Sequence, residues 1–117
     1  DLAEQAWQII DLAIAIHPHP DLFSSRVVAA YLADRPEEVL ETARRMTYVI
    51  EGELDRIRED ESSVNAATIS FREGQIRVIE EALTDTAVRH SLSAVSVREV
   101  RDRLDQLREQ IEEIKLL

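Results

Sequence analysis

The chain has 117 residues, enough for one ordinary domain, and its 44% of hydrophobic residues argue against intrinsic disorder. Aromatic residues make up only 4%, Gly occurs twice and Pro three times, a composition that favours helices over β-sandwiches and barrels. The absence of Cys excludes a disulfide framework, a thiolate zinc site and a Cys nucleophile, and the net charge of −10 argues against a general binder of nucleic acids or anionic membranes.

The distribution of charge and hydropathy predicts a cytoplasmic domain that does not enter a membrane. No predicted segment of the chain carries a net positive charge. The most apolar run, from Ile9 to Ile16, contains Asp11 and is far shorter than the ~18–20 residues of a membrane span. No signal peptide is visible.

Residues 2–16 are predicted to form a helix. Its polar positions make one narrow stripe at helical spacing: Asp1, Glu4, Gln8 and Asp11. Because almost all other positions are apolar, we expect other helices to surround this one over most of its circumference. The prolines of residues 17–20 (HPHP) end it, and residues 21–33 are predicted to form a second, shorter helix.

The next predicted helix begins at a capping box. Asp34 is the expected cap, with Pro36 early in the helix and Glu37 three residues after the cap. The helix is predicted to run to about residue 60, with one apolar seam at heptad spacing. The seam consists of Leu40, Ala43, Thr47, Ile50, Leu54 and Ile57.

A polar joint at residues 58–65 precedes the least regular part of the sequence. Residues 66–71 (AATISF) fit either a short strand or the start of a helix, and we favour a helix over 64–83. Its expected buried side is Val64, Phe71, Ile76, Ile79 and Leu83. Residues 84–95 are predicted to be a loop or a helical turn.

The last predicted helix begins at a second capping box, Ser96 to Glu99, and has the most regular apolar seam of the chain. The seam residues are Val97, Val100, Leu104, Leu107, Ile111 and Ile114. Gln110 lies off the seam and is expected to face water. The fold class that follows is all-α: a four- or five-helix bundle with a core in residues 1–95. Residues 96–117 form a C-terminal amphipathic helix, either within that domain or as a dimerisation arm.

Two arrangements of residues are candidate metal sites. His17 and His19 could bind a metal with a third ligand from His90 or a carboxylate, but they lack helical spacing and fit an interhelical turn better. A helix-bundle metal-dependent hydrolase would need acids that point inward. The candidate pairs Glu37–Glu41, Glu51–Asp55 and Asp55–Glu59 lie opposite the apolar seam. We therefore expect no metal and no cofactor, and keep the hydrolase as a second alternative.

A helix-turn-helix regulator is the first alternative function. Residues 24–34 and 37–46 have the length of such a pair, residues 62–77 could form a degenerate wing, and C-terminal heptads would supply a dimer. Glu37, Glu38 and Glu41 would face the DNA phosphates, however, and Arg44 and Arg45 are the only close basic pair. Nucleic-acid binding through these two arginines is accordingly not the favoured interpretation.

The favoured function is a non-catalytic interaction or oligomerisation domain of a regulatory or adaptor protein. The expected interface is the seam Val97, Val100, Leu104, Leu107, Ile111 and Ile114, which would pair with a second copy or with a partner helix. The same residues could instead pack within the chain, on the Leu40–Ile57 seam, which matches them in period and length. The sequence leaves both arrangements open.

Overall fold

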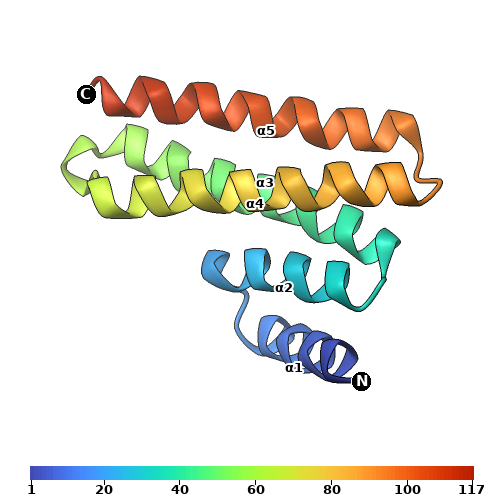
Figure 1. Cartoon of the computed structure of the whole chain (residues 1–117). Coiled ribbons are helices and arrows are strands. Elements are labelled where there is room, and N and C mark those ends of the chain that lie inside the picture. Colours follow the sequence, from blue (N-terminus) through green and yellow to red (C-terminus); the bar gives the residue numbers. More distant parts are fainter.

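Five α-helices and one short 3₁₀ helix make up the computed structural model, which describes all 117 residues (Figure 1). No strand is present, so the all-α prediction is confirmed. The elements are α1 (Leu2–Ile16), α2 (Pro20–Leu32), α3 (Pro36–Glu59), η1 (Glu61–Ser63), α4 (Ala66–Arg89) and α5 (Ala94–Lys115).

Helices α2 to α5 form the bundle, and α1 lies on its outside. In Figure 1, α5 runs along one side of the α3–α4 pair and α2 along the other, with α1 beyond α2. Ion pairs give the directions of the long helices. Arg103 of α5 bonds Glu51 of α3, and Arg58 bonds Glu113 further along both helices, so α3 and α5 are parallel. Helix α4 runs antiparallel to α5, since Glu73 pairs with Lys115.

Both heptad seams are buried inside the one chain. The six residues of the predicted α3 seam are all buried, as expected from their spacing. The six predicted interface residues of α5 are buried as well, with exposures between 0% and 6%: Val97, Val100, Leu104, Leu107, Ile111 and Ile114. Because α5 packs against α3 and α4, this seam is part of the chain's own core and is not a surface open to a partner. The intramolecular arrangement is the one that the structure adopts.

Helix α4 differs from its prediction in length and in its buried face. It continues to Arg89, six residues beyond the predicted end, and residues 66–71 are its first turns, so the favoured helix and not the alternative strand is correct there. Phe71 and Val64 were expected inside but are 52% and 37% exposed. Arg72 is buried instead, because acidic groups from two other helices bind it, and this rotates its neighbour Phe71 out to the surface.

The caps of α3 and α5 differ from the two predicted capping boxes. Asp34 does not cap α3; it ends α2 in the left-handed conformation, with a φ of 58°. The N–H of Arg35 donates to the carbonyl of Ala30 at 2.9 Å and that of Asp34 to Tyr31 at 3.2 Å, which is the Schellman pattern. Helix α5 begins at Ala94, ahead of the predicted cap, because Ser93 accepts a hydrogen bond from the N–H of Ser96.

Gln110 was expected to face water, and this was wrong. Its side chain is partly buried, and its Oε1 atom is buried without a hydrogen-bond partner. Position 110 lies four residues before Ile114 on the same helical side, so the bundle covers part of the glutamine. The buried face of α5 is therefore wider than its heptad seam.

Candidate docking surface

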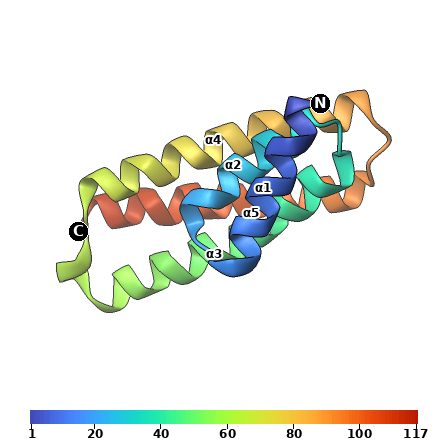
Figure 2. The ribbon, with the colours of Figure 1, turned by 90° about the horizontal axis from the view of Figure 1, so that it is seen from below.

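Helix α1 is the main departure from the sequence-based expectation. It contacts α2 and no other helix, so it is not surrounded as its composition suggested (Figures 1 and 2). Only Trp7 and Ile14 are buried in it. Its large apolar residues that remain exposed, at 63% to 83%, are Leu2, Ile9, Leu12 and Ile16.

Two acids of the polar stripe of α1 explain this orientation, because Glu4 and Asp11 bind arginines of the rest of the chain, while Asp1 and Gln8 stay exposed. The Nη2 atom of Arg26, on α2, donates to Asp11 at 2.8 Å. Arg35, at the α2–α3 turn, bonds Glu4 and holds the pKa of that carboxyl below its ordinary value. The Trp7 ring lies against both cations, 4.2 Å from the Arg26 guanidinium carbon and 5.2 Å from that of Arg35. The acids of α1 are thus bound inward, and its apolar residues point out.

The outward side of α1 has a regular form, which we call the α1 ridge. It consists of Leu2, Ala6, Ile9, Ala13 and Ile16, with Leu12 beside it. The spacings along the ridge are 4, 3, 4 and 3 residues, the period of a helix that packs against another helix. No charged residue belongs to it. In a chain with 32% charged residues, such a surface is unusual.

A groove of about 1000 Å³ lies beside the α1 ridge, which we call the α1–α4 groove. Helix α1 forms one wall, α4 forms the other, and α2 forms the floor. Its large apolar lining residues are Ile10, Val28, Leu32, Phe71 and Val78. Arg77 is the only charged side chain in the lining. Gly74 of α4 also lines the groove, and no atom lies within 4 Å of where its Cβ would be, so this wall is open.

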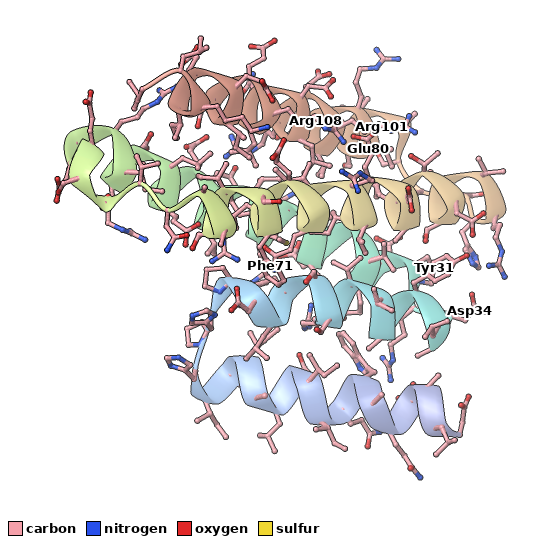
Figure 3. The ribbon with its side chains drawn as sticks, turned by 60° about the vertical axis from the view of Figure 1, so that its left-hand side comes forward. Tyr31, Asp34, Phe71, Glu80, Arg101 and Arg108 are labelled. Atoms are coloured by element: carbon pink, nitrogen blue, oxygen red, sulfur yellow. The ribbon has the colours of Figure 1, made fainter.

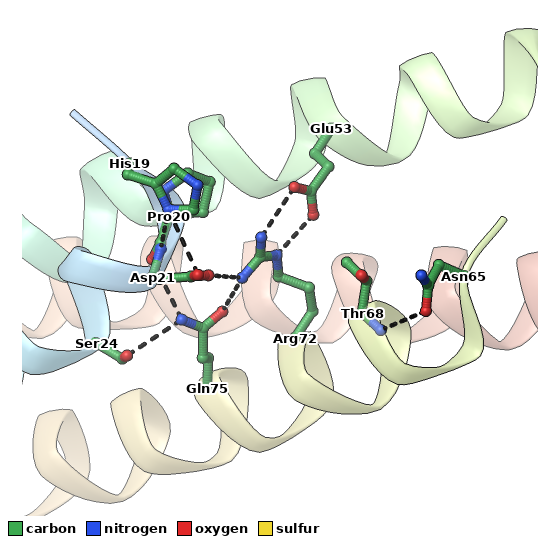
Figure 4. Close-up of polar contacts among 9 residues, drawn as sticks. All are labelled: His19, Pro20, Asp21, Ser24, Glu53, Asn65, Thr68, Arg72 and Gln75. Carbon is green, nitrogen blue, oxygen red and sulfur yellow. Dashed lines mark hydrogen bonds and ion pairs between the residues drawn. The ribbon is translucent and has the colours of Figure 1, made fainter. Parts of the chain in front are cut away.

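A buried arginine near the N-terminal end of α4 fixes the orientation of this helix (Figure 4). Arg72 donates to Glu53 of α3 at 2.6 Å and to Asp21 of α2 at 2.7 Å. Burial alone would lower the pKa of Arg72, but its bonds to the two carboxylates outweigh burial and raise the pKa above its ordinary value. Gln75 completes the network through Arg72, Ser24 and the Pro20 carbonyl. Phe71, labelled in Figure 3, is therefore held toward the groove.

A second polar cluster holds the opposite end of α2 against α4. The Tyr31 hydroxyl donates to Asp85, and Arg89 donates to the same carboxylate at 3.4 Å. The Tyr31 hydrogen bond holds the pKa of Asp85 below its ordinary value and raises the pKa of Tyr31. His90 Nε2 lies 2.9 Å from Asp34, beside this cluster. Both ends of the groove floor are thus fixed by polar contacts, of which Figure 4 shows those made by Arg72 and Gln75.

The histidines and acids considered for metal binding are not brought together. No group of three or more His, Asp or Glu side chains could hold a metal ion. His17 and His19 lie at the α1–α2 turn with ring centroids 5.7 Å apart, and His19 caps α2 by accepting from the N–H of Asp21. Among the predicted acid pairs, Glu41 bonds Arg44 and Glu51 bonds Arg103.

The two helices assigned to a helix-turn-helix lie in α2 and α3, but the segment assigned to the wing takes another form. Residues 62–77 include part of η1 and of α4, so the predicted wing is wrong. Arg44 pairs with Glu41 at 3.0 Å, and the guanidinium of Arg45 lies over the Phe23 ring. Both arginines therefore have contacts within the chain.

Comparison of the chain with known protein families, characterised proteins and solved structures finds no match to any of them. None of the five helices combines the length and the apolar character that crossing a bilayer requires.

Proposed function

We propose that the chain is a non-catalytic interaction domain and that it binds its partner through the α1 ridge and the α1–α4 groove. The observation that carries this proposal is the exposure of eight large apolar side chains on three helices, α1, α2 and α4. They are Leu2, Ile9, Leu12, Ile16, Val28, Leu32, Phe71 and Val78, each between 38% and 83% exposed. Monomeric proteins rarely leave an apolar surface of this extent uncovered.

The form of the surface favours a helix as the bound element. The groove is lined by three helices, and eight of its 14 lining residues are hydrophobic. An amphipathic helix that lays its apolar side into such a groove is a recurring mode of recognition. The surface departs from the interface expected from the sequence, which was the α5 seam; that seam is used inside the bundle, and α1, α2 and α4 carry the exposed apolar residues.

The proposal is tested by titrating the ¹⁵N-labelled chain with a synthetic amphipathic helical peptide whose apolar side is Leu and Ala. Amide shifts are expected in α1, α2 and the first half of α4. Amides of α5 should not move, since α5 contacts neither α1 nor α2. A peptide that shifts only α5, or that shifts nothing at millimolar concentration, would contradict the proposal. Leu32→Glu, which places a charge on the groove floor, is expected to weaken binding at least about tenfold.

A further inference from the structure

The partner that fits this surface best is a second copy of the same chain. We propose that two copies pair around a two-fold axis, with the α1 ridge of each lying in the α1–α4 groove of the other. This inference rests on the proposed function and names the occupant of its surface. Three observations support it: the shape of the surface, its area and its charge.

The shape is self-complementary. A two-fold dimer needs the same patch to carry both the protruding and the receiving part. Here the α1 ridge protrudes directly beside the groove, because α1 is itself one wall of that groove. Helix α1 has 15 residues and is about 22 Å long, and the groove wall from Ala67 to Val78 on α4 spans about 18 Å. The ridge of one copy therefore matches the groove of the other in length.

The exposed apolar area is close to what one partner buries in a standard interface. The eight exposed apolar residues of the ridge and groove together expose roughly 800 Å² per chain, and about 800 Å² per partner is what a standard interface buries. Pairing covers Ile9, Leu12 and Ile16 of one copy with Val28, Leu32 and Phe71 of the other. A short partner helix lying in the groove alone would leave the outer side of the α1 ridge in water.

The charge distribution favours contact at this place. Two copies with a net charge of −10 each repel one another, so an interface between them must lie where acids are absent. The ridge carries no charge, and the groove carries only Arg77. The acids of α1, Glu4 and Asp11, are bound to Arg35 and Arg26 on the side away from the ridge. A basic partner would find no opposite charge here, and an acidic partner would find only Arg77.

Sedimentation equilibrium of the purified chain tests the proposal. The wild type is expected to approach twice its chain mass of 13.4 kDa as its concentration rises through the micromolar range. Ile9→Glu should raise the dissociation constant by at least about 100-fold, because it would place a carboxylate in the apolar interface. Ile9 is 69% exposed in the single chain, so the far-UV circular dichroism of the variant should match that of the wild type.

Val95→Glu is the matched control. Val95 is 77% exposed at the start of α5, which contacts neither α1 nor α2, so the same substitution should leave the dimer intact. A wild type that stays monomeric at millimolar concentration would contradict the proposal that a second copy occupies the groove. Binding of the helical peptide by that monomer would leave the proposed function standing. A dimer that survives Ile9→Glu would use another surface and would also overturn the proposal.

A disulfide cross-link locates the contact independently. The chain has no Cys, so a single introduced thiol reports one position. Chains carrying Ile9→Cys, mixed with tagged chains carrying Phe71→Cys and oxidised gently, should form the mixed disulfide. Chains carrying Val95→Cys should not form it with the Phe71→Cys chains. A mixed disulfide with Val95→Cys in preference to Ile9→Cys would contradict the two-fold arrangement.

Discussion

At the scale of single residues, Asp34 shows that the signal for the end of one helix can resemble the signal for the start of the next. Its sequence context matches the start of a helix, yet its φ of 58° and the bonds around it end the preceding one. A residue with a Cβ in this conformation is strained, least so for Asp and Asn, whose short polar side chains can bond locally. Both roles use an Asp before Arg-Pro, so the sequence alone could not separate them.

Substitutions at position 34 test this assignment. Asp34→Val should lower the free energy of unfolding by roughly 1–2 kcal/mol, because a β-branched residue strongly disfavours the left-handed region. Asp34→Gly should not lower it, since glycine adopts that region without strain. Urea unfolding of the two variants measures the difference. A valine variant at least as stable as the glycine variant would contradict the left-handed conformation of residue 34.

The Tyr31–Asp85 hydrogen bond makes stability depend on pH. The bond lowers the pKa of Asp85 from its ordinary value of 3.8, so the unfolded chain takes up this proton more readily than the folded chain. The stabilisation is therefore complete above pH 3.8 and is lost as the pH falls through the lowered value. Tyr31→Phe removes the hydroxyl, and the stability gap between wild type and variant should shrink from pH 7 to pH 3. Urea unfolding at both pH values measures it; an equal gap at both would contradict the coupling.

At the scale of elements, regular patterns were predictable and context-dependent orientations were not. The seams of α3 and α5 are buried at every predicted position, because heptad spacing defines one side of a helix without reference to its partner. The spacing alone could not decide whether the α5 seam packs within one chain or between two chains, because that depends on how the whole bundle is arranged. In α1 the pattern identified the polar stripe, but its direction depended on Arg26 and Arg35, whose positions in space the sequence does not give.

The candidate surface was missed for the same reason. Leu2, Ala6, Ile9, Ala13 and Ile16 already have heptad spacing in the sequence, and that signal could have identified the ridge. The same spacing also predicts burial, since an apolar helix is ordinarily enclosed. Phe71 was expected on the buried side of the helix over 64–83, together with Ile76, Ile79 and Leu83. The partners of Arg72 that turn Phe71 outward are 19 and 51 residues away in the chain.

The α5 seam gives a prediction about the bundle. Leu107 is 1% exposed at the middle of α5, so Leu107→Glu would bury an unpaired carboxylate and should cost several kcal/mol, enough to unfold the domain. Gln106→Glu is the control, because residue 106 is exposed, and it should change stability by less than about 0.5 kcal/mol. Position 110 is unsuited as a control, since the Gln110 Oε1 atom is buried. Circular dichroism during urea unfolding distinguishes the two; a Leu107→Glu variant as stable as wild type would contradict this packing.

At the scale of the whole molecule, net charge and apolar surface oppose one another. Repulsion between two chains of charge −10 resists their association. The ridge, which carries no charge, and the groove, which carries only Arg77, favour it. The dimer should therefore tighten as NaCl is raised from 50 to 500 mM, because salt screens the repulsion and leaves apolar burial intact. Sedimentation equilibrium across this range measures the effect. Weaker association at high salt would indicate attraction between opposite charges and would contradict an apolar interface.

The central claim is that the ridge of one chain lies in the groove of another, and an isotope-filtered NOE spectrum tests it most directly. The sample is a 1:1 mixture of ¹³C-labelled and unlabelled chains, so that only contacts between chains give signals. We expect intermolecular NOEs between the Phe71 ring and the methyl groups of Ile9 and Leu12. Intermolecular NOEs confined to α5 residues such as Val95, or none at millimolar concentration, would contradict the claim.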